Sequence, residues 1–159
     1  MHDEVLSTGD CGACDRYAAE NGVPLQQLMQ AAGQGVARAI RERWAPRPTI
    51  VLCGPGNNGG DGFVAGAALR EAGWPVRVAL LGDPGPLRGD AAWALAQWGR
   101  PVEAMEPCVL DGAALVVDAV FGAGLNRAPG GAAADVIQAM AGLPACVPVV
   151  AVDLPSGLS

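Results

Sequence analysis

The chain has 159 residues, of which 51% are hydrophobic, 16% are charged and 4% are aromatic. This length is typical of one domain, and the apolar content is too high for an intrinsically disordered chain. The formal net charge is −6 and the ten basic residues are all arginines spread along the sequence, which argues against a nucleic-acid partner.

Missing residue types exclude several kinds of chemistry. The chain has no lysine, which rules out Schiff-base catalysis and a Walker A phosphate loop. Its single histidine, His2, lies at the terminus, so a Ser-His or Cys-His pair in the core is not available. No apolar run reaches the roughly 18 residues of a membrane helix, and the N-terminus does not resemble a secretory signal. We therefore expect a cytoplasmic protein with no membrane partner.

The five cysteines are odd in number, as is usual for reduced thiols in a cytoplasm. Cys11 and Cys14 have the C-x-x-C spacing of redox and zinc sites. A zinc ion would need two further ligands, and only His2 is near in sequence. A redox pair of the thioredoxin type follows a strand, whereas this pair begins a helical segment. We favour two small residues on the first helix.

The periodicity of the apolar residues predicts two leading helices, followed by alternating strands and helices. In chain order we expect helices over 10–20 and 24–44, a strand over 49–53, a helix over 62–72, a strand over 76–81, a helix over 88–98, strands over 101–104 and 113–117, a helix over 132–141 and a strand over 148–152. Such units form right-handed crossovers. The sequence thus predicts an α/β protein with a Rossmann-like three-layer fold, whose mainly parallel sheet has helices on both faces.

The last predicted strand is apolar at nearly every position from Val147 to Val152. This pattern favours a strand that is covered on both faces and flanked on both sides. An apolar edge strand is an aggregation hazard unless another strand pairs with it. Because the chain stops six residues after Asp153, we expect residues 1–159 to form a single domain that is incomplete at its C-terminus, or one whose sheet a partner completes.

A glycine-rich segment between the first strand and the next helix is the strongest local feature. Gly54, Gly56 and Gly59 satisfy the pattern G-x-G-x-x-G, which directs a pyrophosphate to a helix N-terminus. Asp83, after the second strand, lies near the place of a ribose-binding acid in a dinucleotide fold. The glycines alone could serve only a tight strand–helix turn. The polar residues Asn57, Asn58 and Asp61 among them favour a binding site.

Two carboxylates follow at the ends of later strands. Asp118 ends the fourth predicted strand and Asp153 ends the fifth, with Ser156 shortly after it. In an open parallel sheet, ligands bind outside the carboxyl ends of the strands, where the strand order reverses. We expect the first, fourth and fifth strands to meet there. Each carboxylate alone could also be a helix cap or a turn residue.

Four segments together carry a resemblance to a known family. They are Leu28-Met29-Gln30-Ala31-Ala32-Gly33, Asn57-Asn58-Gly59-Gly60-Asp61-Gly62, Val117-Asp118-Ala119-Val120-Phe121-Gly122-Ala123-Gly124-Leu125 and Val152-Asp153-Leu154-Pro155-Ser156-Gly157-Leu158. In order and spacing they resemble the signatures of the NAD(P)HX epimerase family, also called the YjeF N-terminal domain. Two features depart from the family: Gln30-Ala31 replaces its usual Glu-Asn, and the family domain continues beyond the Pro-Ser-Gly turn.

The resemblance implies an isomerase that interconverts the R and S epimers of hydrated NADH and NADPH at C6 of the nicotinamide ring. It also implies a bound potassium ion, with Asn58, Asp118 and Ser156 as its ligands. The substrate-binding residues that it implies are Asn57, Asn58, Gly59, Gly60, Asp61, Gly122, Ala123, Gly124, Leu125, Asn126, Arg127, Ala128 and Asp153. Oxygen ligands suit a hard cation. Asp153 is also our candidate for the acid/base residue, since epimerisation at a carbon bearing nitrogen and hydroxyl requires proton transfer.

Two other functions stay open at this point. One is an NAD(P)-binding oxidoreductase of the Rossmann type, although no His, Lys or Tyr stands in a catalytic position after the third strand. The other is a non-enzymatic nucleotide-binding or interaction module. The expected partners of an epimerase are hydrated NADH or NADPH and, as a functional link, an ADP-dependent NAD(P)HX dehydratase. The sequence leaves a homodimer open.

Overall fold

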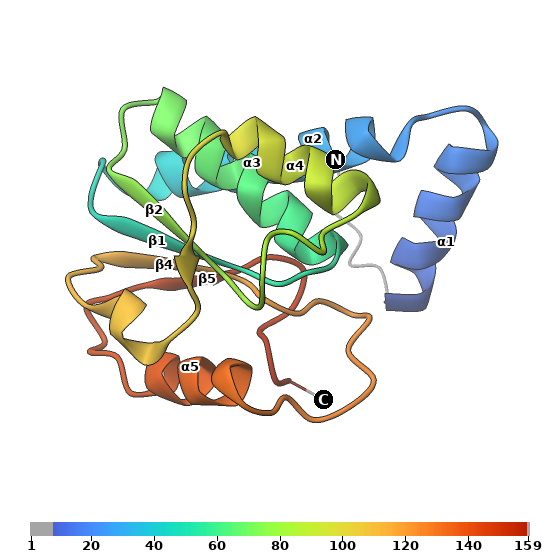
Figure 1. The fold of residues 1–159 in the computed structure, drawn as a ribbon. Coiled ribbons are helices and arrows are strands. Elements are labelled where there is room, and N and C mark those ends of the chain that lie inside the picture. The colour runs from blue at the N-terminus through green and yellow to red at the C-terminus, as the bar shows by residue number, and fades with distance from the viewer. Residues whose placement is uncertain (1–7, 159) are drawn as a thin grey trace.

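The computed structural model describes residues 8–158 and shows a parallel sheet between two layers of helices (Figure 1). The elements are α1 (Thr8–Glu20), α2 (Leu25–Arg43), β1 (Thr49–Cys53), α3 (Asn57–Glu71), β2 (Val76–Leu80), α4 (Gly89–Trp98), β3 (Glu103–Ala104), the 3₁₀ helix η1 (Pro107–Leu110), β4 (Leu115–Ala119), α5 (Ala132–Ala141) and β5 (Val149–Ala151). This arrangement confirms the predicted fold class and the two leading helices.

The five strands are parallel and lie in the order β3-β2-β1-β4-β5. The chain builds the sheet outward from β1 to β3 on one side, and then returns to place β4 on the other side of β1. The strand order therefore reverses between β1 and β4, which is where ligands bind in open parallel sheets. The prediction that the first, fourth and fifth strands are neighbours is confirmed.

Alternate residues of the strands face two separate cores because successive strand side chains point to opposite faces. Val51 and Val117 belong to the core beneath α2, α3 and α4. Ile50 and Val116 belong to the core that η1 and α5 cover. All five residues of β1 and of β4 are buried, as the apolar run of β1 predicts, and the buried residues of β4 include Asp118.

The third helix begins earlier than the sequence pattern predicts. It starts at Asn57 instead of Gly62, so the glycine-rich segment forms its first turns. Glycines here allow close packing: a Cβ atom on Gly59 would collide with the carbonyl group of Gly54, and one on Gly62 would lie 2.6 Å from the Cβ atom of Ala119. The first turn of a helix also tolerates polar residues, since its N–H groups have no acceptor within the helix.

The last strand differs from its prediction in length and burial. It covers three residues instead of five, and Val149 is 44% exposed, so the prediction of cover on both faces is wrong for this residue. In the described chain β5 pairs with β4 and lies at the edge of the sheet. An apolar run indicates a strand but not its neighbours, because the neighbours come from distant parts of the chain.

The fourth strand also differs slightly from its prediction, because Asp118 lies inside β4, one residue before the strand ends.

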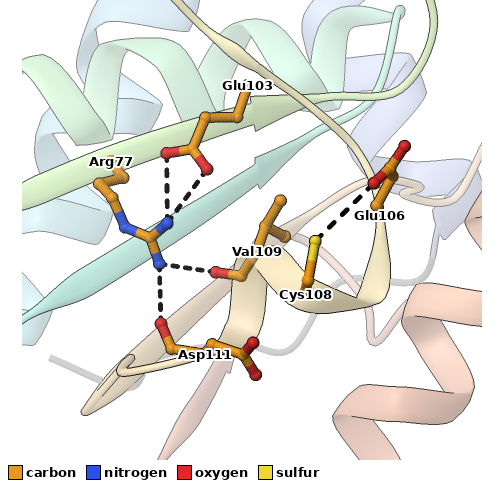
Figure 2. A network of polar contacts seen from close by, with 6 residues as sticks. All are labelled: Arg77, Glu103, Glu106, Cys108, Val109 and Asp111. Carbon is orange, nitrogen blue, oxygen red and sulfur yellow. Dashed lines mark hydrogen bonds and ion pairs between the residues drawn. The ribbon is translucent and has the colours of Figure 1, made fainter.

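At the opposite end of the strands, Arg77 joins β2 to β3 and η1 (Figure 2). Its Nη1 atom donates to both carboxylate oxygens of Glu103, at 3.0 and 3.3 Å. Its Nη2 atom donates to the backbone carbonyl oxygens of Val109 at 2.7 Å and Asp111 at 3.1 Å. This network is remote from the carboxyl ends of the strands, and we assign it a structural role.

The N-terminal features add no site to the described part of the chain. His2 lies outside the described residues, and so does the side chain of Cys11. Cys14 lies on α1 and is an exposed free thiol. Within residues 8–158, no cluster of three or more His, Cys, Asp or Glu side chains is arranged to bind a metal ion. No described helix combines the length and apolarity needed to cross a bilayer.

Candidate active site

A cleft of about 870 Å³ opens at the carboxyl ends of β1 and β4, where the strand order reverses. Its wall is formed by the turn before α3, the first turns of α3, the loop after β4 and the turn after β5. The lining residues are Ala32, Pro55, Gly56, Asn57, Asn58, Asp61, Val120, Phe121, Gly122, Ala123, Gly124, Leu125, Asn126, Arg127 and Asp153.

The cleft brings together most of the residues that the sequence singled out. Asn57, Asn58, Asp61, Asp153 and the loop residues 122–127 all line it. Gly59 and Gly60 are buried behind it, where Gly59 packs against Gly54 and Gly60 packs against Met29. Ala128 is exposed and lies beyond the lining. Asp83 also lies outside the cleft: its carboxylate accepts a hydrogen bond from the backbone N–H of Gly85 at 3.0 Å, within its own turn.

Five further lining residues were not among the predicted site residues: Ala32, Pro55, Gly56, Val120 and Phe121. Each of them lies inside or next to a segment that the sequence did single out. Ala32 belongs to the leading helix segment, and Phe121 directly precedes the glycine loop. The sequence could not indicate these residues, because an apolar residue or glycine next to a motif looks the same in sequence whether it lines a cleft or packs in the core. Phe121 belongs to the cleft and to the core at once, since it lines the cleft and also packs against the core that α5 covers.

Asp118 and Ser156 form a buried pair beneath the cleft. Their residues are 2% and 8% exposed. Ser156 donates to Asp118 twice, from its hydroxyl to Oδ1 at 2.6 Å and from its backbone N–H to Oδ2 at 2.7 Å. The hydroxyl of Ser156 also accepts a hydrogen bond from the backbone N–H of Phe121 at 2.9 Å. The pair thus holds the turn after β5 against the end of β4 and the start of the cleft loop.

Asp153 presents its carboxylate at the cleft from an unusual backbone conformation. Its φ angle is +67°, in the left-handed region that few residues other than glycine adopt. Its Oδ2 atom accepts a hydrogen bond from the backbone N–H of Ala123 at 2.7 Å. Strained residues that are held by their surroundings cluster at active sites and ligand clamps. The carboxylate is exposed to the cleft and fixed in direction by a neighbouring loop.

Asn58 connects the first turn of α3 to the same region. A Cβ atom on Gly122 would lie 3.2 Å from Asn58 Oδ1, so the amide lies against the residue that follows Phe121. The Nδ2 atom of Asn58 is buried and has no hydrogen-bond partner in the described chain. Such a group is costly unless something else binds there. Rotating the amide by 180° would place its oxygen at that position, where a cation would be a suitable partner.

The donor set therefore fits a hard cation such as potassium. Asp118 and Ser156 offer a carboxylate and a hydroxyl that are hydrogen-bonded to each other, and Asn58 offers an amide oxygen beside Gly122, which follows the Phe121 that contacts Ser156. Within the described residues, the hydrogen bonds to the Asp118 carboxylate come from neutral donors, Ser156 and the backbone N–H of Val120 at 3.3 Å. A buried carboxylate gains most from a positive partner, and oxygen ligands are those that hard cations prefer.

Comparison with known proteins gives one family and several relatives. The family model described as YjeF-related protein N-terminus matches residues 25–159. An NAD(P)H-hydrate epimerase of Rhodobacter capsulatus is 41% identical over 166 residues, covering 97% of this chain and 77% of the relative. A bifunctional NAD(P)H-hydrate repair enzyme of Thermofilum pendens is 38% identical, covering 98% of this chain and 32% of the relative. The crystal structure of a yeast protein has the same fold, with a TM-score of 0.83, 24% identity and coverage of 97% and 71%.

Proposed function

This chain belongs to the family described as YjeF-related protein N-terminus, and we propose that it is an NAD(P)H-hydrate epimerase, an isomerase that interconverts the R and S epimers of hydrated NADH and NADPH. The family match over most of the chain and the relative at 41% identity support this assignment. The observation that carries it is the exposed carboxylate of Asp153, held by the N–H of Ala123 in a cleft at the switch point of the sheet.

The cleft suits a negatively charged dinucleotide. The first N–H groups of α3, at residues 57–59, have no acceptor within the helix and point toward the helix N-terminus, where the helix dipole favours an anion. A pyrophosphate placed there would receive hydrogen bonds without any lysine. Arg127 is the basic residue in the lining and can bind a further phosphate oxygen. We therefore assign phosphate recognition to the start of α3 and to Arg127.

Asp153 is the group that transfers the proton. Inverting C6 requires the bond from this carbon to the ring nitrogen, or the bond to its hydroxyl oxygen, to break and form again on the other face. In the ring-opening route, a carboxylate removes the hydroxyl proton while the bond from C6 to nitrogen breaks, and the nitrogen takes up a proton. Closure on the opposite face reverses these transfers. The Oδ2 atom of Asp153 is occupied by Ala123, which leaves Oδ1 for the hydroxyl of the substrate.

We extend the proposal to a potassium ion held by Asn58, Asp118 and Ser156. When bound, the cation would supply positive charge next to the phosphate-binding end of α3. The residues themselves support this: a buried carboxylate, a hydroxyl bonded to it and a buried amide with an unpartnered nitrogen. The chain is net negative and its substrate is an anion, so charge compensation near the cleft favours binding.

We also propose a cytoplasmic location and a functional link to a dehydratase that consumes one epimer. The four cysteines whose side chains the structure describes, Cys14, Cys53, Cys108 and Cys146, are free, as is typical of a reducing compartment. The Thermofilum pendens relative, named as a bifunctional NAD(P)H-hydrate repair enzyme, supports the link.

The test is a coupled assay on the purified chain. A mixture of both epimers of hydrated NADPH is incubated with a dehydratase that consumes only the S form, and consumption of the R form is then followed. We expect the chain to accelerate it, and Asp153→Asn to reduce kcat by about 100-fold or more. Asp83→Asn is the matched control, because Asp83 is an exposed aspartate outside the cleft. R-form consumption at the rate of the enzyme-free blank would disprove the assignment.

A further inference from the structure

Gly122 lies at the point where two functional side chains from different segments meet. A Cβ atom added to this glycine would be 2.5 Å from Asp153 Oδ2 and 3.2 Å from Asn58 Oδ1. Asp153 comes from the turn after β5, and Asn58 comes from the first turn of α3. The space above the Gly122 backbone is therefore filled by the ends of these two side chains. No other residue type can stand at position 122 without displacing the carboxylate.

The orientation of Asp153 depends on the backbone of the same loop. Its left-handed φ angle of +67° fixes where its Cβ atom points. The N–H of Ala123, the residue next to Gly122, then fixes Oδ2 at 2.7 Å. This hydrogen bond requires the carboxylate to approach the loop backbone closely, which a side chain at position 122 would prevent.

We propose that Gly122 is a positioning residue for the reaction, because its missing side chain lets the loop hold the carboxylate of Asp153 and the amide of Asn58 together in one orientation. This inference rests on the proposed function. It assigns to Gly122 a role that is separate from any contact with substrate: the glycine acts through Asp153 and Asn58. A single glycine thereby couples the acid/base group to the amide that we assign to the cation.

The geometry also indicates that Gly122→Ala will fold. The atoms that the new methyl group would meet are the ends of the Asp153 and Asn58 side chains, which can rotate away once the hydrogen bond from Ala123 is given up. At Gly54, by contrast, a Cβ atom would collide with the backbone of Val120, which cannot move without disturbing the sheet. We therefore expect Gly122→Ala to change the position of Asp153 without unfolding the protein.

The experiment compares Gly122→Ala with Gly130→Ala in the same connection between β4 and α5. Gly130 lies outside the cleft, and a Cβ atom there would meet no atom within 4 Å. We expect Gly122→Ala to lower kcat by about 10- to 100-fold with little change in KM, since a misplaced reacting group costs rate more than affinity. The exchange of the Ala123 amide hydrogen, measured by NMR, should become faster because its acceptor has moved. Gly130→Ala should match the wild type in both measurements.

The Asp153→Asn variant tests the carboxylate charge of Asp153 apart from its hydrogen bond with the backbone N–H of Ala123. Asparagine keeps an oxygen that can accept from Ala123, so slow exchange of the Ala123 amide should persist while activity is lost.

The possible outcomes distinguish this inference from the proposed function. If the wild-type chain does not epimerise the substrate, the proposed function fails, whatever the exchange data show. If the wild type is active and Gly122→Ala keeps full activity and slow exchange at Ala123, the positioning role is overturned. Melting of Gly122→Ala more than about 5 °C below Gly130→Ala would also overturn it, because the glycine would then serve the fold and not the site.

Discussion

The hydroxyl of Ser156 donates a 2.6 Å hydrogen bond to Oδ1 of Asp118, although 38 positions separate the two residues in sequence. The backbone N–H of Ser156 donates a second hydrogen bond, to Oδ2 of the same carboxylate. Through it, β4 fixes the turn that follows β5, and that turn carries Asp153. The position of Asp153, the proposed acid/base residue, thus depends on a buried carboxylate that does not itself line the cleft.

Replacing this carboxylate should destabilise the protein and also remove the proposed cation site. In Asp118→Ala, both Ser156 donors lose their acceptor, so we expect the free energy of unfolding to fall by about 2–4 kcal/mol. Urea unfolding followed by circular dichroism measures this value. Repeating it in potassium chloride and in choline chloride tests the cation, because a ligand bound only by the native state stabilises it.

The control for this experiment is Asp83→Ala, which removes an exposed carboxylate that caps its own turn. It should leave the potassium effect unchanged. Persistence of the full potassium-dependent stabilisation in Asp118→Ala would show that Asp118 is not a ligand.

The crossing of α2 and α3 gives a matched pair of glycine substitutions. A Cβ atom on Gly33 would lie 2.5 Å from the Cβ atom of Val64 and 2.7 Å from the backbone oxygen of Asp61, whereas one on Gly35 would meet nothing. Gly33→Ala should therefore cost about 1–3 kcal/mol of stability, because the helices must separate. Gly35→Ala in the same helix should stabilise the protein by up to about 1 kcal/mol. Thermal melts of the two variants that shift in the same direction would contradict this packing.

Burial in the core raises the pKa of the Cys53 thiol well above its usual range. The exposed thiols of Cys14, Cys108 and Cys146 should therefore react with iodoacetamide near pH 8.5, while Cys53 stays unmodified until the protein unfolds. Mass spectrometry of the labelled peptides measures this difference. Rapid labelling of Cys53 in the native protein would show that β1 is not a fully buried central strand.

The same shift predicts how stability depends on pH. Because the folded protein holds the Cys53 proton more tightly than the unfolded chain, its contribution is fully present below the unfolded pKa. It is lost as the pH rises above about 9, by up to about 1.4 kcal/mol for each pH unit. Urea unfolding between pH 8 and pH 10 should show this decline, and Cys53→Ala should make it shallower.

The network of Arg77 separates an exposed ion pair from hydrogen bonds to the backbone (Figure 2). Glu103→Ala removes only the ion pair, whose side chains are 44% and 42% exposed, and should cost less than about 1 kcal/mol. Arg77→Ala also frees the carbonyl oxygens of Val109 and Asp111, and should cost about 1–2 kcal/mol. In 1 M salt the effect of Glu103→Ala should vanish while that of Arg77→Ala remains. If the two substitutions had equal effects at low salt and both effects vanished in 1 M salt, the stabilisation would reside in the ion pair alone.

Local patterns in the sequence were sufficient to predict the order of the α-helices and strands, although not the 3₁₀ helix η1, and to predict the edge of the sheet where the cleft lies. The apolar run from Thr49 to Cys53 indicates a buried strand, because only a strand covered on both faces is apolar throughout. Asp118 and Asp153 could be placed at one rim because the carboxyl ends of parallel strands meet at one edge. The four ordered segments then identified the family from residue types and spacing alone.

Tertiary structure alone decided how these residues face one another. The start of α3 at Asn57, the 44% exposure of Val149 and the contact of Gly122 with both Asn58 and Asp153 depend on neighbours that come from distant segments. The direction of the Asp153 carboxylate follows from a left-handed backbone angle and from the N–H of Ala123, 30 positions earlier. A sequence pattern specifies periodicity and residue type, but the direction of a side chain depends on the backbone angles and the packing that the whole fold imposes.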